Sequence, residues 1–207
     1  MIAYLPLGGH RRPGIKPPRE HDCQPAVCYN ADNPSPLIRW RIPMILYIIR
    51  HAWAGPYGDP AWPDDFQRPL TAEGSLRFAQ VVRTLAERDF APQIVATSPL
   101  VRCRQTAEIV ARQTPTEPEV VNVDALMPGS DLAEALAWTA GAAAALEQIA
   151  WVGHAPDVGN LTGALVGDSS ASIRFAKGAV AAVRFDGPPR VGQGELRWLA
   201  TAKLLGC

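Results

Sequence analysis

From residue 44 onward, apolar residues occur in short runs separated by polar segments, and the length of each run predicts the element it forms. The first run, at 45–49, holds five apolar or aromatic residues and stops at Arg50 and His51. Such a run is typical of a strand buried on both faces inside a parallel sheet. Three further runs predict strands, at 93–97, 120–123 and 148–152.

Between these runs the apolar positions recur about every 3.6 residues, which predicts amphipathic helices. In the first of them the repeat continues to about Arg88. The residues expected on its buried stripe are Leu76, Ala79, Val82 and Ala86, joined by Phe78, Val81 and Leu85. Helix starts are predicted at Thr71, at Ser98 followed by Pro99, at Asp131 and at Pro156.

The order of these elements predicts the fold class. The last two apolar runs, 179–185 and 195–200, flank a turn rich in Gly and Pro and predict a hairpin at the sheet edge. The repeated strand, helix, strand order implies a mostly parallel sheet with helices on both faces. We therefore expect an α/β protein, a three-layer α/β/α sandwich, formed by one domain over residues 44–207.

Residues 1–43 differ in character, with eight prolines and mixed charge without periodicity. Such a segment buries too little apolar surface to offset the entropy of ordering it. We expect a disordered Pro-rich tail, or a translation start placed too far upstream. His21, Cys23 and Cys28 resemble part of a zinc site, but no second Cys/His pair follows them, so no metal is predicted.

Composition and charge limit the possible partners. The 20 basic and 20 acidic side chains cancel, whereas a nucleic acid or an anionic membrane selects a net basic face. We expect neither as a partner. No apolar run is long enough for a membrane helix, and residues 1–7 do not form a secretory signal, so we expect a cytoplasmic protein. Its four cysteines are expected to be reduced, and a monomer is compatible with the sequence.

Histidine and arginine side chains stand where predicted strands end. Arg50 and His51 follow the first strand, His154 follows the fourth, and Arg102 lies in the first turn of the helix after the second. The carboxyl ends of parallel strands lie at one edge of a sheet, where open α/β sheets bind ligands. Two imidazoles and two guanidiniums without a matching carboxylate make a poor metal site and a good site for a phosphoryl group.

Four short motifs, in this order, resemble those of the histidine phosphatase superfamily, which has the phosphoglycerate-mutase-like fold. They are RHA at 50–52, RPLTAEG at 68–74, SPLVRCRQTAE at 98–108 and VGHAP at 152–156. The spacing, the compact length and the RPLT and GHAP forms look most like the SixA-type phosphohistidine phosphatases. The resemblance extends from about residue 44 to the end of the chain.

The resemblance implies a role for each matched side chain. His51 would be the nucleophile that takes the phosphoryl group onto its imidazole. Arg50, Arg102 and His154 would bind phosphoryl oxygens, with Arg68 as a further contact. Neither a cofactor nor a metal would be needed, because arginines supply the positive charge that phosphoryl transfer requires.

Some features depart from the superfamily's pattern. Ala52 stands where most members have glycine. If the turn after His51 requires a positive φ, alanine would be strained there. Cys103 replaces a small alanine, a change we expect to be neutral. Many members also place a carboxylate after the third strand as a general acid, and that segment here contains Met127 and Pro128 instead. The remaining candidates are Asp64, Asp65 and Asp124, and the sequence selects none of them.

The sequence thus predicts a phosphatase that works through phosphorylated His51. A site without a general acid suits a leaving group that is easily expelled, so phosphohistidine in a protein is the expected substrate. One alternative is a phosphatase for small phosphate esters. Another is a pseudoenzyme that binds phosphorylated ligands without turnover, as the alanine at 52 and the missing acid would allow. A mutase is least favoured, because it must retain its intermediate.

Overall fold

The central strand of the fold is β1 (Met44–Arg50), which the apolar run at 45–49 predicts. The computed structural model describes residues 43–142 and 145–207, so nearly all of the tail predicted at 1–43, with its partial zinc set, lies outside the described residues. The described strands form one sheet in the order β3-β2-β4-β1-β5-β6. The other strands are β2 (Ile94–Thr97), β3 (Glu119–Asn122), β4 (Gln148–Gly153), β5 (Val180–Phe185) and β6 (Glu195–Ala200).

The sheet is parallel over its first four positions and antiparallel at one edge. β1 pairs with β4, and β2 with both β3 and β4, in parallel register. β5 and β6 form the antiparallel hairpin predicted at the edge, with β5 paired to β1. The expected mostly parallel sheet is therefore confirmed.

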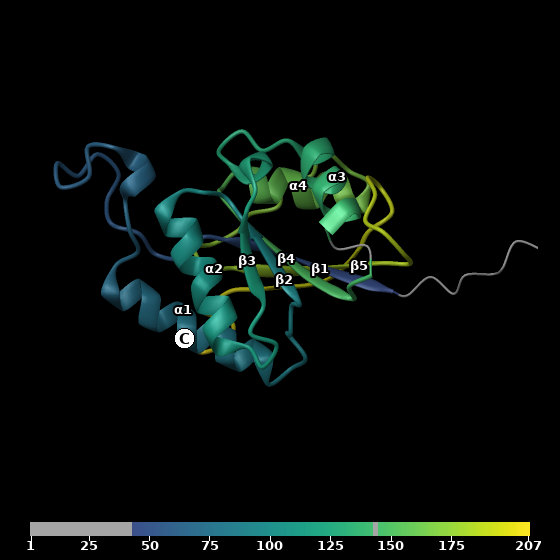
Figure 1. The fold of residues 1–207 in the computed structure, drawn as a ribbon, viewed down its shortest axis with the longest axis horizontal. Coiled ribbons are helices and arrows are strands. Elements are labelled where there is room, and N and C mark those ends of the chain that lie inside the picture. Colours follow the sequence, from purple (N-terminus) through teal and green to yellow (C-terminus); the bar gives the residue numbers. More distant parts are fainter. Residues whose placement is uncertain (1–42, 143–144) are drawn as a thin grey trace, which may run out of the picture. The chain divides into compact units, whose positions relative to one another are not determined.

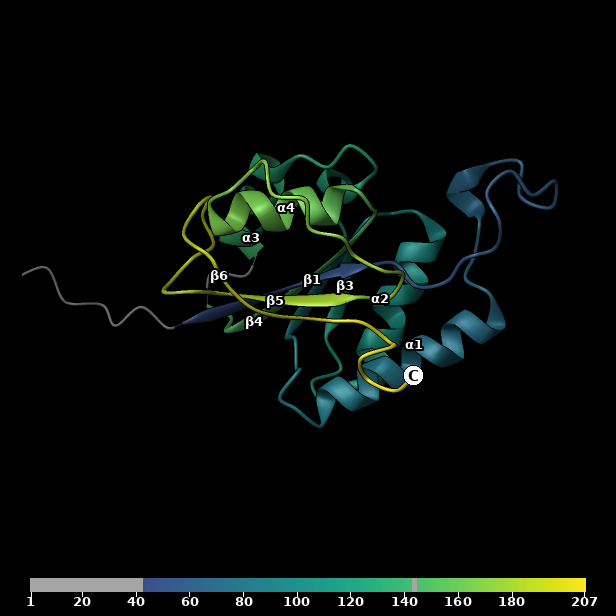
Figure 2. The same ribbon diagram turned by 180° about the vertical axis from the view of Figure 1, so that it is seen from behind.

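Helices cover both faces of the sheet, as Figures 1 and 2 show. One face carries α1 and α2, and the opposite face carries α3 and α4, which gives the expected three layers. Two short 3₁₀ helices precede α1 and α3. The bounds are α1 (Ala72–Ala86), α2 (Val101–Gln113), α3 (Leu132–Ala142), α4 (Asp157–Val166), η1 (Asp65–Gln67) and η2 (Asp124–Leu126).

Side chains alternate along β1 between two hydrophobic cores. Leu46 and Ile48 pack in the cluster that includes α4, whereas Tyr47 and Ile49 pack in the cluster that includes α1 and α2. A strand of a parallel sheet with apolar residues on both faces needs a helical layer on each side to exclude water from them. This requirement explains the unbroken run at 45–49.

Two local predictions are wrong. Leu76 is 74% exposed, because α1 buries a stripe centred on Phe78 and Val82. Leu76 is about 200° around the helix axis from Phe78, at 100° per residue. Ser98 does not cap α2, which begins at Val101 without a side-chain cap, whereas the predicted cap of α1, Thr71, is confirmed.

Gly178 carries the sharpest backbone requirement near the end of β1. Its φ is +66°, and a Cβ atom there would lie 3.0 Å from Phe78 Cδ2 and 3.0 Å from Trp53 Cζ3. We expect Gly178→Ala to lower the free energy of unfolding by about 2 kcal/mol, because backbone strain and overpacking add. Urea unfolding measures this change. Gly141→Ala in α3, where a Cβ meets nothing within 4 Å, is the control and should not destabilise; equal effects would contradict the argument.

Candidate active site

The pairing of β1 with β4 brings the two histidines together. Arg50 and Gly153 are register partners at the ends of these strands, so His51 and His154 follow at neighbouring positions. Their ring centroids are 5.4 Å apart. The backbone N–H of His51 also donates to the carbonyl oxygen of Gly153, at 3.0 Å, which fixes this arrangement.

A pocket of about 480 Å³ lies beyond these strand ends. It is lined by every side chain that the sequence nominates as nucleophile or phosphoryl ligand, by Asp65, one of the three candidate acids, and by Lys177, which the sequence does not nominate. The nominated residues that line it are Arg50, His51, Arg68, Arg102 and His154. The predicted convergence of distant segments at one rim of the sheet is therefore observed.

Within the part of the chain that the structure describes, one nitrogen of the His51 imidazole has a hydrogen-bond partner and the other has none. Nδ1 lies 2.8 Å from the carbonyl oxygen of Ala52, and because a carbonyl can only accept, Nδ1 carries the proton and Nε2 keeps its lone pair. Burial of the ring, and then the charges of His154, Arg102 and Arg50, lower the pKa of His51 to about 3, against the opposing effect of the Ala52 hydrogen bond. The ring is neutral at pH 7, as a nucleophile requires.

Ala52 fits the turn after His51 without strain. The described non-glycine residues with positive φ are Asp89 and Glu117, so Ala52 does not need the conformational freedom of glycine. Its side chain is fully buried, and its backbone N–H donates to Thr106 Oγ1 at 3.0 Å. The departure from glycine at this position therefore leaves the backbone around the nucleophile intact.

Asp65 bridges the two arginines at the opposite side of the pocket. Its carboxylate accepts from Arg68 Nε at 2.7 Å and from Arg102 Nη2 at 2.9 Å. Its carbonyl oxygen accepts from Arg102 Nη1 at 2.8 Å, and Arg68 Nη1 reaches the carbonyl oxygen of Gly55. Arg102, only 4% exposed, is therefore held in one orientation before any ligand binds.

Asp65 is unsuited to be a general acid. Burial raises the pKa of its carboxyl group, but hydrogen bonds and charges from Arg68 and Arg102 outweigh this effect, so the pKa is lowered overall. The group is therefore ionised at pH 7 and has no proton to give. Of the other two candidates, Asp64 accepts from the backbone N–H of Phe66 at the start of η1, and neither Asp64 nor Asp124 lines the pocket.

His154 is fixed by partners that sequence patterns do not identify. Its Nε2 lies 2.9 Å from Ser98 Oγ and 3.4 Å from Cys103 Sγ, while Nδ1 lies 3.4 Å from Arg102 Nη2. Burial, and then Arg102, lower the pKa of His154 to about 4, so this ring is also neutral at pH 7. Burial raises the pKa of Cys103 to about 12, which keeps its sulfur in the thiol form.

Arg50 connects the pocket to the loop that precedes β5. Its Nη1 donates to the carbonyl oxygen of Phe175 at 2.8 Å, and its Nε is buried without a hydrogen-bond partner among the described residues. Burial, and then the charge of Arg174, lower the pKa of the guanidinium. Lys177 enters the pocket from the same loop, and nothing in the sequence around it distinguishes it from an ordinary surface lysine.

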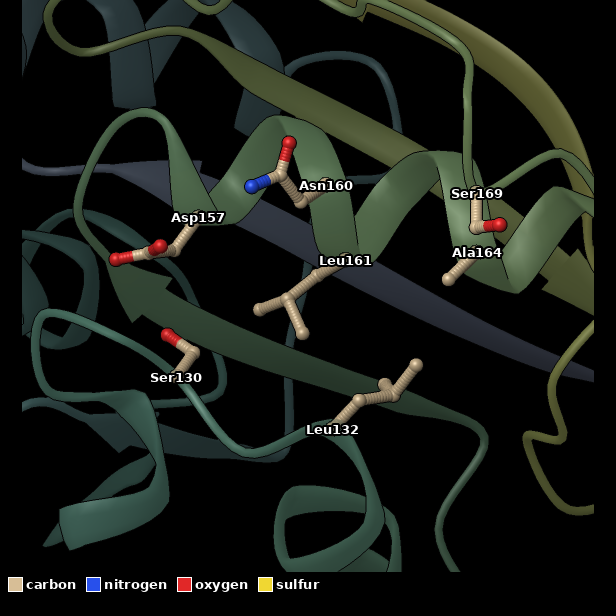
Figure 3. A pocket seen from close by; sticks show the side chains of 7 residues that line it. All are labelled: Ser130, Leu132, Asp157, Asn160, Leu161, Ala164 and Ser169. Atoms are coloured by element: carbon tan, nitrogen blue, oxygen red, sulfur yellow. The ribbon is translucent and has the colours of Figure 1, made fainter.

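A second, smaller pocket of about 230 Å³ lies between α4 and the segment that leads into α3. Leu161 and Leu132 face each other across it, with Asp157 and Ser130 at one end (Figure 3). Asp157 Oδ2 accepts from the backbone N–H of Gly129 at 3.0 Å, so this carboxylate joins the loop to the first turn of α4. None of the residues nominated for catalysis lines this pocket.

Two further findings concern the described residues as a set. They contain no group of three or more His, Cys, Asp or Glu side chains arranged to hold a metal ion. No helix among them has the length and apolar character needed to cross a membrane.

The chain resembles known proteins in sequence and in structure. The model of the histidine phosphatase superfamily, branch 1, matches residues 46–127. An uncharacterized protein from Picosynechococcus sp. is 34% identical over 144 residues, which cover 68% of this chain and 85% of that protein.

Solved structures share the fold. The protein histidine phosphatase SixA, complexed with tungstate, has a TM-score of 0.68 and 25% identity, over 78% of this chain and 99% of that chain. Phosphoglycerate mutase from Plasmodium falciparum has a TM-score of 0.52 and 15% identity, over 78% and 91% of the two chains. This last likeness concerns the fold alone, and it confirms the phosphoglycerate-mutase-like architecture. The chain belongs to the histidine phosphatase superfamily and is similar to its SixA-type members.

Proposed function

We propose that the protein hydrolyses phosphohistidine in a phosphorylated protein, through a covalent phosphoryl intermediate on His51. The observation that carries this proposal is the free Nε2 lone pair of His51 in a pocket lined by Arg50, Arg68, Arg102 and Lys177. These cations supply the charge stabilisation on which phosphoryl transfer depends. Membership of the superfamily, and the similarity to a protein histidine phosphatase, support the same assignment.

The reaction would proceed in two displacements. His51 Nε2 forms a bond to phosphorus while the bond from phosphorus to the substrate's imidazole nitrogen breaks, and the electron pair of that bond returns to the leaving ring. A phosphorylated imidazole that is protonated on its other nitrogen leaves as a neutral ring and needs no acid. Water then attacks the phosphoryl group on His51, which releases phosphate and restores the free imidazole.

This chemistry matches a pocket whose lining carboxylate is already ionised. Asp65 cannot supply the proton that an alkoxide leaving group would require, because its pKa is lowered by Arg68 and Arg102. A sugar phosphate is therefore a poorer substrate for this site than phosphohistidine. Ala52 gives no support to a pseudoenzyme, because its backbone is unstrained and it accepts the hydrogen bond that orients His51.

The direct test is brief incubation of the protein with ³²P-labelled phosphoramidate, followed by acid and alkali treatment. We expect a label that is lost in acid, survives alkali and maps to His51. A panel that compares a phosphohistidine peptide with small phosphate esters then tests the substrate class. Turnover without a label on His51, or a preference for sugar phosphates, would contradict the proposal.

Ser98 acts as a positioning residue for His154 in this scheme. Without a ligand, Nδ1 of His154 accepts from Arg102 Nη2, 3.4 Å away. A bound phosphoryl oxygen only accepts hydrogen bonds, so the neutral ring can then donate to it through Nδ1 only when Nε2 accepts from the Ser98 hydroxyl, 2.9 Å away. We expect Ser98→Ala to raise the Kd of inorganic phosphate, and to lower kcat/KM, by about tenfold. Thr162→Val, which removes another buried hydroxyl, is the control. An unchanged phosphate Kd in Ser98→Ala would rule out this role.

A further inference from the structure

A basic pocket of about 470 Å³ adjoins the phosphoryl pocket, and the two share Arg50 and Lys177. Its other charged lining residues are all cationic: Arg77, Arg174 and Lys203. Acidic and basic residues are equal in number over the whole chain, so this accumulation of one sign is local. Together the two adjoining pockets, called the basic groove below, carry more positive charge than a single phosphoryl group needs.

The backbone of the loop that carries two of these cations is anchored beside His51. The loop that carries Arg174 and Lys177 is tied to the end of β1, because Arg50 Nη1 donates to the carbonyl oxygen of Phe175 at 2.8 Å. The backbone N–H of Gly178 donates to the carbonyl oxygen of His51 at 3.2 Å. Two anchors within four residues leave this loop little freedom to move relative to the nucleophile.

These charges lack acidic partners within the part of the chain that the structure describes. Arg174, Lys177 and Lys203 are exposed, and none forms an ion pair there, whereas other surface arginines do. Arg77 is fixed by stacking on Trp53, at 4.4 Å from the ring centroid, and by donating to the carbonyl oxygen of Cys207. Like charges held together repel each other. An anionic ligand bound here would lower this repulsion, and its binding would be stabilised accordingly.

Three aromatic side chains near the phosphoryl pocket are exposed, and one of them, Tyr57, lines it. Tyr57 is 84% exposed, Phe66 41% and Trp62 39%. All three belong to the segment between β1 and α1, drawn as the blue loop that projects from the body in Figure 1. Exposed aromatic side chains are typical of contacts with another protein, and Trp62 and Phe66 do not line the pocket in which a small phosphate ester would bind.

We infer that the substrate is a protein whose phosphorylated side chain is flanked by an acidic surface. Arg77, Arg174, Lys177 and Lys203 bind that acidic surface while the phosphoryl group enters the pocket of His51. Electrostatic complementarity of this kind raises the association rate and selects the orientation of the partner. The inference rests on the proposed phosphatase function and adds the class of partner.

Two phosphohistidine peptides of equal length test the inference, one with aspartate and glutamate around the phosphorylated residue and one with asparagine and glutamine instead. For the wild-type protein at low salt we expect kcat/KM to be about tenfold higher for the acidic peptide, with the difference lost in about 0.5 M NaCl. Equal kcat/KM values for the two peptides at low salt would overturn the inference.

The variant Arg174→Glu/Lys203→Glu reverses two charges that lie outside the phosphoryl pocket. We expect its kcat/KM to fall at least tenfold more for the acidic peptide than for phosphoramidate, because the charge at position 174 also acts on Arg50 and so affects both substrates. Arg190→Glu is the matched control. Arg190 lies in the turn at 186–194, which follows Phe185, and Phe185 pairs with Met44 at the start of β1. The pocket lies beyond the other end of β1, so this turn is at the opposite end of the strands. Equal losses on the acidic peptide and on phosphoramidate would also overturn the inference.

Binding of the unphosphorylated acidic peptide, measured by fluorescence anisotropy, separates the two proposals. Wild-type protein that binds this peptide more tightly than the charge-reversed variant, but turns over no phosphohistidine, would contradict the phosphatase function and retain the docking surface. Turnover without any difference in binding would contradict the docking surface and retain the phosphatase.

Discussion

Replacing His51 by asparagine should lower kcat for phosphohistidine hydrolysis by at least about 10³-fold, because it removes the only atom assigned to attack phosphorus. The asparagine amide can still donate a hydrogen bond to the carbonyl oxygen of Ala52, as His51 Nδ1 does over 2.8 Å. The turn after β1 should therefore keep its conformation. Stopped-time assays with a phosphohistidine peptide measure the loss, and the label from phosphoramidate should disappear from the protein.

The control for this variant is its fold and its affinity for phosphate. Arg50, Arg102 and His154 remain in place, so inorganic phosphate should bind with a Kd within about threefold of the wild-type value. A variant that binds phosphate normally but neither turns over nor becomes labelled places the defect in the covalent step. Full activity in His51→Asn would refute the assignment of the nucleophile.

The parts of this site that local sequence patterns predict are those at the ends of apolar runs. Arg50 and His51 close the run that forms β1, and His154 follows the run that forms β4, so the placement of all three depends only on where each strand stops. The alternation of strand and helix patterns then determines the layered architecture. Burial and polarity are local properties of the chain, and this explains why these elements can be predicted.

Other parts of the site depend on pairings between distant segments. Ser98 meets His154 because Thr97 and Val152 are partners in the parallel pairing of β2 with β4. A serine followed by proline otherwise favours a helix cap, which is the prediction that proved wrong. Lys177 reaches the pocket because the Arg50 guanidinium binds the backbone of its loop, a contact that no short-range pattern encodes.

The exposure of Leu76 shows the limit of apolar periodicity within one helix. α1 contains apolar residues on more than one face, and the face that is buried is chosen by the sheet and by α2 rather than by α1 itself. The larger side chain of Phe78, together with Val82 and Leu85, decides the orientation because it buries more surface. A single leucine can remain in water at little cost.

A second large effect that we expect is a steep loss of stability in mild acid, caused by the two buried imidazoles. Burial first, and then neighbouring charges, lower the pKa of His51 to about 3 and that of His154 to about 4. In the unfolded chain both return to the ordinary value of 6.5. Between these values the unfolded state binds more protons than the native state, so the free energy of unfolding decreases as the pH falls through this range.

Near pH 5 the difference is about two protons, which predicts a decrease of about 2–3 kcal/mol in the free energy of unfolding for each pH unit. Urea unfolding at a series of pH values from 7 to 5 measures this slope. The double variant His51→Asn/His154→Gln lacks both imidazoles, and its slope should fall to that of the remaining groups. If the double variant keeps the wild-type slope, the two histidines are not the source of the acid sensitivity. The native protein keeps His51 neutral from pH 7 to 5. Protonation of His51 should therefore not lower kcat/KM of the folded protein in that range.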